Sequence, residues 1–445
     1  MGVVDGSSRL IAARLATAAL VSSLLLAAGP PAAHPSAHPM TPAVGVNAQV
    51  DDVGEAFPDG QIKFGCQAAN FSVPCYGPDQ VRAAYHVQPL LDAGITGAGQ
   101  TIVIIGAFQA PTVQSDLAAF DQTWGLPAAD LQLRTPDGVP TFDPGNSVQR
   151  AWAIEASIDV EWAHAIAPGA QLQLVLAKSE ADADILHATE YAIDNNLGDI
   201  ISQSFGEAES CQDAQFFAHQ HAAFKRAQQQ GITLIAASGD TGAAQHTCDG
   251  SLVAGVSFPA SDPLVTAVGG THLVADRVTG AWQSETGWGD VSGASGGGFS
   301  DRYHRPIYQV PMVDSHHGRG LPDVALGSSA FGAVIARASG RFGRSVGTSA
   351  ATAEWAGIAA LAGQAAGHRL GSLNPRLYAI AKTSAYADVM HDITAGDNTF
   401  QGFTGFSAGA SWDPMTGLGT PDVEQLVSLL RDSDPGSEEP DQTSD

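Results

Sequence analysis

Positive charge is scarce in this 445-residue sequence. Only 20 Lys and Arg stand against 46 Asp and Glu, so the formal net charge is −26 at pH 7. A nucleic-acid backbone or an anionic membrane surface carries negative charge and would repel such a chain. Neither is therefore expected as a partner. An acidic surface by itself indicates only good solubility.

Long hydrophobic runs are absent after the first 33 residues. Residues 1–33 have the pattern of an export signal, in which Arg9 and Arg14 lead into an apolar run from residue 15 to 28 and then into small residues. That run is shorter than the roughly 20 residues that a membrane-spanning helix needs. The sequence predicts a secreted, monomeric protein with no membrane association once the signal is removed.

Cysteine is also rare, and no CxxC motif is present, which argues against a thiolate metal site. An even number of cysteines in an exported chain favours disulfides. Four cysteines allow three pairings, and the local ones are preferred, Cys66 with Cys75 and Cys211 with Cys248.

Glycine and hydrophobic residues are plentiful, with 50 Gly and 44% hydrophobic content. Apolar runs alternate with helical patterns, and unbroken apolar strands separated by helices indicate an α/β fold with a parallel sheet covered on both faces. The expected strands are 101–105, 172–176, 199–204, 232–237 and 264–268, and the expected helices are 148–166, 182–195 and 214–230.

The predicted organisation is a single large domain over residues 77–430. It follows the signal peptide and an irregular Pro- and Ala-rich leader over residues 34–76, which leaves no room for a full-length propeptide. Residues 431–445 are rich in acids and predict a solvated tail.

Three short motifs carry reactive side chains. Asp240 follows the end of a predicted strand, and parallel sheets usually carry their functional residues at the carboxyl ends of their strands. Glu155 and Asp159 are four residues apart and share one helix face, among bulky apolar neighbours. Ser349 opens an Ala-rich segment, which predicts a helix N-terminus that favours developing negative charge.

Each motif has an ordinary explanation when it is taken alone. The Asp240 tripeptide is typical of a turn, the two acids are compatible with a solvated helix edge, and Ser349 with a helix cap. Their order and surroundings favour a functional interpretation. The motifs that support this interpretation include Trp162 to Gly169, Ser238-Gly239-Asp240, Phe258-Pro259-Ala260-Ser261, Gly296 to Ser300, Arg319 to Asp323, Gly347-Thr348-Ser349 and Trp355-Ala356-Gly357.

In these motifs residues 77–427 resemble the sedolisin family of serine-carboxyl peptidases, which includes kumamolisin-like enzymes. The resemblance implies a subtilisin-like sheet and an acid-acting serine-type endopeptidase, with tripeptide release as a possible second mode. It makes Ser349 the nucleophile, Glu155 the general base and Asp159 the group that orients Glu155. Asp240 would act in the oxyanion hole, because a protonated carboxyl can donate to an oxyanion.

The resemblance also implies a substrate strand and one structural Ca²⁺. Ser204-Phe205-Gly206 is similar to the strand that pairs with the peptide substrate. The implied calcium ligands are hard oxygen donors, namely the side chains of Asp392 and Asp413 and the carbonyl groups of Ile393, Gly409 and Ser411.

Two alternatives stay open. A subtilisin-type Asp-His-Ser peptidase fits Gly347-Thr348-Ser349, but no aspartate ends the strand at 101–105 and no His-Gly-Thr helix start exists. His164 lies nine residues after Glu155 and is expected to pack or bond locally. The second alternative is a catalytically inactive, calcium-stabilised secreted binding protein on the same scaffold.

Overall fold

The computed structural model describes residues 39–42, 62–69, 71–313 and 317–432, all of them within one compact unit over residues 38–445. The strands are β1 Thr41–Pro42, β2 Cys75–Tyr76, β3 Thr101–Ala107, β4 Asp130–Arg134, β5 Gln171–Ala177, β6 Ile200–Gln203, β7 Phe205–Ala208, β8 Thr233–Ala237, β9 Ala244–His246, β10 Leu252–Ala254, β11 Ser257–Phe258, β12 Thr266–Ala275, β13 Trp282–Gly287, β14 Gly289–Asp290, β15 Gly293–Ala294, β16 Gly298–His304, β17 Gly318–Leu321, β18 Val324–Gly327, β19 Ala333–Ala338, β20 Arg341–Ser345, β21 Met390–His391 and β22 Thr420–Pro421.

The helices follow the same numbering along the chain. They are α1 Pro78–Ala84, α2 Gln88–Asp92, α3 Val113–Trp124, α4 Ser147–Ile166, α5 Asp182–Asp194, α6 Ala214–Gln229, α7 Thr348–Ala366, α8 Asn374–Ala381, α9 Tyr386–Val389 and α10 Val423–Asp432, with short 3-10 turns at Gly65–Gln67, Glu209–Cys211, Ile307–Gln309 and Ala330–Gly332.

A central sheet in the order β13-β12-β8-β6-β3-β5-β4, with β18 also beside β12, confirms the predicted parallel architecture. All neighbours in it are parallel except the β12–β13 pair. β5 and β4 lie on one side of β3, and β6 lies on the other side of β3. Parallel sheets commonly bind ligands at such a reversal of strand order, which here lies at the carboxyl ends of β3 and β6.

The predicted strands and helices are present, and most of their boundaries lie within two residues of those expected. β12 differs most, because it ends at Ala275 rather than at 268 and begins at Thr266 rather than at 264, where a turn occupies the preceding residues. The Leu264 amide donates to the Asp262 side chain and the Val265 amide to the Asp262 carbonyl, so neither is available for the sheet.

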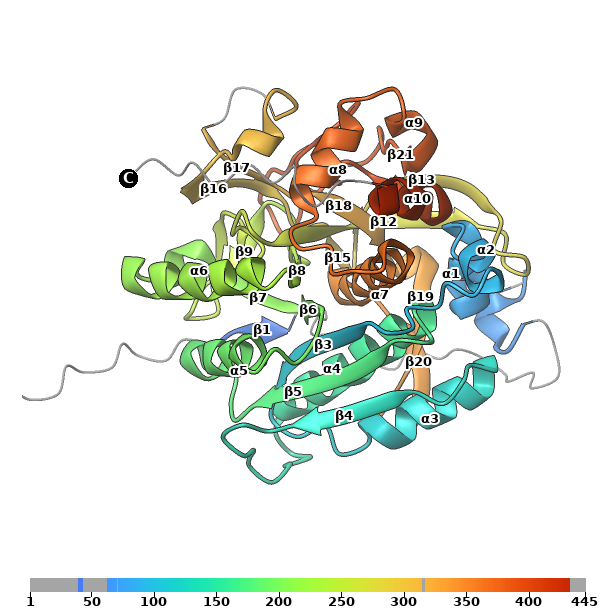
Figure 1. Cartoon of the computed structure of the whole chain (residues 1–445), viewed down its shortest axis with the longest axis horizontal. Coiled ribbons are helices and arrows are strands. Elements are labelled where there is room, and N and C mark those ends of the chain that lie inside the picture. Colours follow the sequence, from blue (N-terminus) through green and yellow to red (C-terminus); the bar gives the residue numbers. More distant parts are fainter. Residues whose placement is uncertain (1–38, 43–61, 70, 314–316, 433–445) are drawn as a thin grey trace, which may run out of the picture. The chain divides into compact units, whose positions relative to one another are not determined.

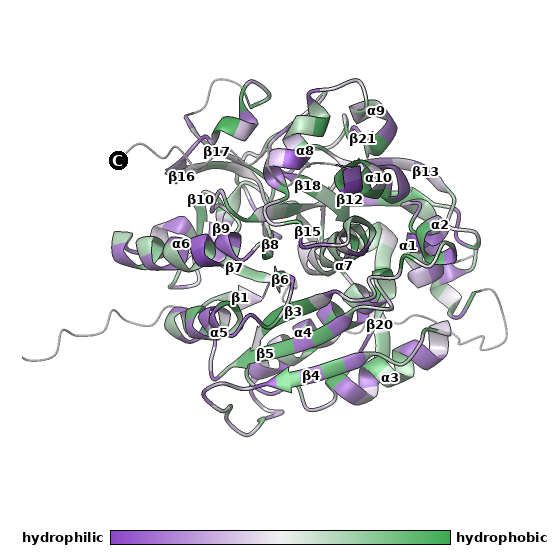
Figure 2. Cartoon of the chain, viewed as in Figure 1, coloured by the Kyte–Doolittle hydropathy of each residue, from purple (hydrophilic) through white to green (hydrophobic). Residues whose placement is uncertain are grey.

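Helices cover both faces of the sheet (Figure 1). α4 and α7 belong to one buried core, whereas α5 and α6 contribute to the other. Figure 2 shows hydrophobic colours along β3 and many hydrophilic residues on α6, which agrees with a buried central strand and a solvated outer helix. The sheet is thus buried on both faces, as its continuous apolar strands require.

α4 and α7 pack directly against each other at Gly357. A Cβ atom at Gly357 would lie 2.6 Å from the Ile166 Cβ atom and 3.2 Å from the Ala163 carbonyl oxygen. Only glycine allows this approach without moving one helix. The Gly357 contact therefore sets the separation of the two helices.

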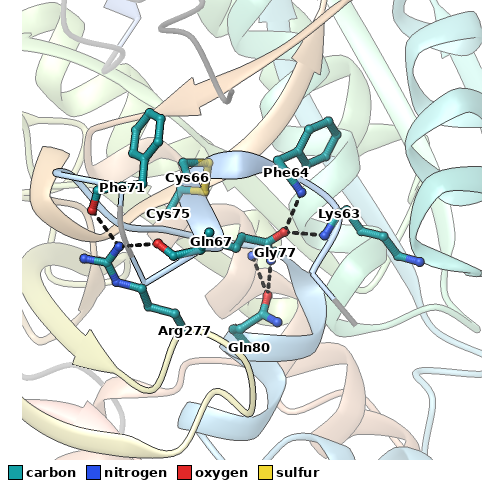
Figure 3. The surroundings of a disulfide bond; sticks show 10 residues. Lys63, Phe64, Cys66, Gln67, Phe71, Cys75, Gly77, Gln80 and Arg277 are labelled. Carbon is teal, nitrogen blue, oxygen red and sulfur yellow. Dashed lines mark hydrogen bonds between the residues drawn. A yellow bond between two sulfur atoms is a disulfide. The ribbon is translucent and has the colours of Figure 1, made fainter. Parts of the chain in front are cut away.

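The described parts of the expected irregular leader over residues 34–76 include two short paired strands. β1 pairs with β7 and β2 pairs with β19, so both segments belong to sheets. Cys66 and Cys75 form the expected disulfide, and the Gln67 side chain accepts from the amides of Lys63 and Phe64 beside it (Figure 3). The strand pairings join the segment to the domain, while the disulfide and the Gln67 bonds fix its own conformation.

The second expected disulfide is not formed. Cys211 and Cys248 are free thiols, and the Cys248 amide donates to the Cys211 sulfur at 2.6 Å. The predicted signal peptide and nearly all of the acidic tail lie outside the described residues. Within the described ranges, no helix is both long and apolar enough to cross a membrane.

We expect Gly357→Ala to lower the free energy of unfolding by about 1–3 kcal/mol, because the new methyl group overpacks the α4–α7 contact. Gly363→Ala on the same helix is the matched control. There a Cβ atom meets only the end of the Gln100 side chain, which can rotate away. Denaturant unfolding of both variants measures the difference, and equal stabilities would contradict the assigned contact.

Candidate active site

α4 supplies two buried carboxyl groups. The helix begins after Asn146, whose side chain accepts from the amides of Val148 and Gln149. Glu155 and Asp159 follow one turn apart on the same face, and each is only 1% exposed. The two acids are therefore neighbours in a place from which water is excluded.

α7 supplies the hydroxyl group. Gly347 has φ +128°, a backbone conformation that side chains disfavour, and it turns the chain from β20 into the helix. Ser349 lies in the first turn, at the positive end of the helix dipole, and is 1% exposed. The α4–α7 contact brings this turn toward the acids of α4.

The loop after β8 brings a third carboxyl group to the start of α7. The Asp240 Oδ1 atom accepts from the Thr348 amide at 2.8 Å and from the Thr348 hydroxyl at 2.9 Å. Asp240 is thus fixed beside the residue that precedes Ser349. Sequence reasoning missed Thr348 as a positioning residue, although its place directly before Ser349 was a usable signal.

The residue after β6 contacts the carboxyl pair. Ser204 is buried, and its hydroxyl donates to the Asp159 Oδ1 atom at 2.7 Å. We expected Ser204 to serve the substrate strand through its backbone, and the sequence did not reveal this side-chain contact. Phe205 and Gly206 follow in β7, where the backbone of β1 lies along them.

Burial dominates the electrostatics of the two acids on α4. Burial raises the pKa of Glu155 well above its usual range, and the adjacent Asp159 raises it further. Burial also raises the pKa of Asp159, while the Ser204 hydroxyl opposes this shift. Two adjacent buried carboxyl groups cannot both ionise easily, so the pair retains a proton under conditions where exposed carboxyls lose theirs.

The Ser349 hydroxyl is near enough to Glu155 to lower its pKa, although the two groups fall short of hydrogen-bond geometry. Catalytic hydrogen bonds are often long in an empty site and shorten when substrate binds. The Ser349 hydroxyl and the Glu155 carboxyl group are therefore adjacent but not hydrogen-bonded.

His164 makes its hydrogen bond elsewhere, not to these groups. Its Nε2 atom is 2.9 Å from the Pro127 carbonyl oxygen, and the residue is fully buried. Burial lowers its pKa, which favours the neutral form. Within the described part of the chain, no histidine hydrogen-bonds to the site acids, so the site relies on carboxyl groups.

The two aspartates expected as calcium ligands both accept hydrogen bonds from the loop of residues 409–413. The Asp413 Oδ2 atom accepts from the Gly409 amide at 3.1 Å, and the Asp392 Oδ2 atom accepts from the Ser411 amide at 3.0 Å. The two carboxylate side chains beside this loop supply the hard oxygen donors that Ca²⁺ prefers. Among the described residues no group of three or more His, Cys, Asp or Glu could hold a metal, so carbonyl groups would have to complete this site.

Comparisons with known proteins agree with this arrangement. The subtilase family model (Peptidase_S8) matches residues 151–404, more than half of the chain. Kumamolisin from Bacillus sp. (strain MN-32) is 32% identical over 83% of this chain and 66% of its own length. Sedolisin from Pseudomonas sp. (strain 101) is 29% identical over 76% of this chain and 58% of its own length.

This chain belongs to the subtilase family, on its sedolisin branch. The solved structure of Pseudomonas sedolisin, a serine-carboxyl proteinase complexed with two molecules of pseudo-iodotyrostatin, matches it with a TM-score of 0.70. The match covers 81% of this chain and 99% of the solved one, at 26% identity. Tripeptidyl-peptidase 1 of Mus musculus is 33% identical over 62% of this chain and 52% of its own length. The matched part spans about half to two thirds of the named full-length relatives.

This sedolisin-branch chain buries further acids away from the site. Burial raises the pKa of Glu161 and of Glu354 well above the usual range, and raises that of Glu207 to about 8. The folded chain thus holds protons that the unfolded chain loses near pH 4. Their contribution to stability is complete below about pH 4 and is lost as the pH rises through the folded pKa values.

We therefore expect the free energy of unfolding to fall by about 2 kcal/mol or more between pH 5 and pH 8. Glu161→Gln should reduce this dependence, because the amide cannot ionise and its oxygen can still accept from the Arg337 amide. Asp130→Asn, at an exposed residue of β4, is the control. Denaturant unfolding at both pH values measures the slopes, and greater stability at pH 8 would refute the argument.

Proposed function

We propose that this protein is a serine-carboxyl peptidase that cuts peptide bonds through an acyl-enzyme on Ser349. The observation that carries the proposal is that Asp240 is bonded to Thr348, directly before Ser349, while a buried Glu155–Asp159 pair faces the same helix turn. Family membership supports the same conclusion. Peptides or proteins are the proposed substrates of a monomeric enzyme.

In the proposed reaction Glu155 removes the Ser349 hydroxyl proton as the oxygen attacks the peptide carbonyl carbon. Asp159 orients Glu155 and shares its proton, and Ser204 fixes Asp159. The oxyanion accepts from protonated Asp240 and from the Ser349 backbone amide. Glu155 then returns the proton to the leaving amine, and water releases the acyl group by the same steps in reverse order.

Replacing the nucleophile separates catalysis from a purely binding role. We expect Ser349→Ala to lower kcat by at least about 1000-fold with little change in thermal stability, since only a buried oxygen is removed. Thr352→Ser, one turn later on the same helix, is a conservative control. Cleavage of a fluorogenic peptide library measures activity. Retained proteolysis in Ser349→Ala would favour another nucleophile, and no proteolysis in the unchanged chain would favour the inactive binding scaffold.

We propose that the activity has an acid optimum and a bell-shaped pH profile. Glu155 must be ionised to act as a base, while Asp240 must hold a proton to donate to the oxyanion. The raised pKa values of Glu155 and Asp159 support retention of one proton within the site. Measuring kcat/KM from pH 3 to 8 tests this, and full activity at pH 8 with none at pH 4 would contradict it.

We propose one structural Ca²⁺ at the loop of residues 409–413. Asp392 and Asp413 would supply carboxylate oxygens, and Ile393, Gly409 and Ser411 would supply carbonyl oxygens. The bound ion would neutralise two converging carboxylates and tie the loop to residue 392. A chelator should therefore lower Tm by several degrees, and added Ca²⁺ should restore it. Asp392→Asn should abolish the chelator effect, whereas an unchanged Tm with chelator would argue against the ion.

Secretion is a proposal that rests on the export-signal pattern of residues 1–33. Some relatives are named tripeptidyl-peptidases, so tripeptide release is the second mode to assay beside cleavage within a chain. Mass spectrometry of products from a long peptide distinguishes the two modes.

A further inference from the structure

A short hairpin lies directly beside Asp240. Its strands are β14 and β15, and Val291 and Ser292 form the tip that joins them. The Ala294 amide donates to the Asp240 carbonyl oxygen at 2.9 Å. A Cβ atom at Gly293 would lie 2.9 Å from the same oxygen, so the two backbones approach closely. The hairpin is thus fixed to the residue that is proposed for the oxyanion hole.

A second loop lies directly before α7. It consists of residues 328–331 and follows β18. The Gly347 amide donates to the Ser328 carbonyl oxygen at 2.9 Å, two residues before Ser349. The 328–331 loop is therefore held against the chain where it turns toward the proposed nucleophile.

One aspartate joins the hairpin to this loop. The Asp290 Oδ2 atom accepts from the Ser329 hydroxyl at 2.6 Å, and its Oδ1 atom accepts from the Ser292 amide at 2.7 Å. The Ser329 hydroxyl in turn accepts from the Phe331 amide at 3.1 Å. These bonds fix the hairpin tip relative to the 328–331 loop, while the Val291 and Phe331 side chains take no part in them.

Each of the two loops presents an apolar side chain to solvent. Val291 is 92% exposed and Phe331 is 41% exposed, and both are among the large hydrophobic residues exposed within the described ranges. A single exposed hydrophobic residue needs no explanation. These two differ, because their loops are bonded to each other and to the backbone at Asp240 and beside Ser349. Apolar side chains around a few convergent polar groups are typical of ligand sites.

The strand order places the 328–331 loop on the side of the site opposite to β7. Val268 pairs with Ala237 of β8 and with Val324 of β18, so these two strands lie on opposite edges of β12. β7 follows β6, Asp240 follows β8, and the 328–331 loop follows β18. A peptide whose acyl part lies along β7 therefore directs the residues after its cleaved bond toward this loop and the hairpin.

We infer that Val291 and Phe331 form an apolar subsite for the first three residues after the cleaved bond of a peptide substrate. An extended peptide advances about 3.4 Å per residue, so these three residues cover about 10 Å. The inference rests on the proposed function, and it adds specificity-determining residues on the leaving-group side. Aliphatic or aromatic side chains at these positions remove apolar surface from water, so they should favour cleavage over small side chains.

The first test varies the substrate. An internally quenched peptide that the full chain cuts at a single bond, located by mass spectrometry, is changed to Ala or Leu at each of the first three positions after that bond. We expect kcat/KM to be about fivefold higher for Leu than for Ala at one or more of these positions, from partial burial of the larger side chain. Equal values at all three positions would overturn the subsite.

The second test removes the apolar side chains from the protein. Phe331→Ala should lower this Leu-to-Ala ratio to about twofold, and Val291→Ala should lower it by a factor of about two. Ile307→Ala is the matched control, because Ile307 is 72% exposed in a turn beside α8 and should leave the ratio unchanged. Val291→Ala alters only an exposed hairpin tip, so it decides the question if Phe331→Ala is unfolded. A ratio that stays the same in the folded variants would contradict the assignment.

A substrate without a leaving peptide separates recognition from damage to the reacting groups. The methyl ester of the same acyl part offers no side chain to the hairpin or to the 328–331 loop. Phe331→Ala should therefore hydrolyse this ester with a kcat/KM within about twofold of that of the unchanged chain. An equal loss of activity toward ester and peptide would refute the subsite and indicate a structural role for Phe331.

Failure of the subsite can be told apart from failure of the proposed function. If the unchanged chain hydrolyses neither the peptides nor the ester, the proposed function is refuted and the subsite with it. If cleavage is present and is lost in Ser349→Ala, while Leu and Ala peptides are cut equally well, the subsite alone is refuted.

Discussion

The close approach of α4 and α7 at Gly357 is the constraint on which the rest of the site depends. Glu155 and Asp159 belong to one helix and Ser349 to the other, so the separation of these helices sets the distance between the proposed base and the proposed nucleophile. The sheet beneath them fixes the remaining groups, because Ser204 and Asp240 follow the adjacent strands β6 and β8. A small residue far from any reacting atom therefore governs the reacting geometry.

Burial gives these carboxyl groups their chemical character. In water Glu and Asp are ionised above about pH 4, and such groups are weak bases at neutral pH. Apolar neighbours remove hydration and make ionisation costly, so the pair on α4 keeps a proton, and the bond from Ser204 limits the shift at Asp159. The same packing that joins the helices thus keeps a proton within a pair of carboxyl groups beside Ser349.

The edge of β7 links this chemistry to recognition. A strand edge binds any extended backbone, so selectivity must come from side-chain pockets along it. Met40 is buried in one cluster with Trp152 of α4 and Phe205 of β7, so α4 contributes both to this cluster and to the carboxyl pair.

The sequence by itself determined the sheet and its main helices, and it supplied the candidate reactive groups. Apolar runs such as 101–105 can form only buried strands, and the spacing of Glu155 and Asp159 requires a shared helix face. It could not determine which distant backbone would cover β7, that Ser204 and Thr348 would hold the acids, or that Cys211 and Cys248 would stay unbonded. Those outcomes depend on contacts between residues far apart along the chain, and local patterns carry no information about such contacts. Tertiary structure alone decided them, because only the packed fold fixes which polar groups face each other and which lose their water.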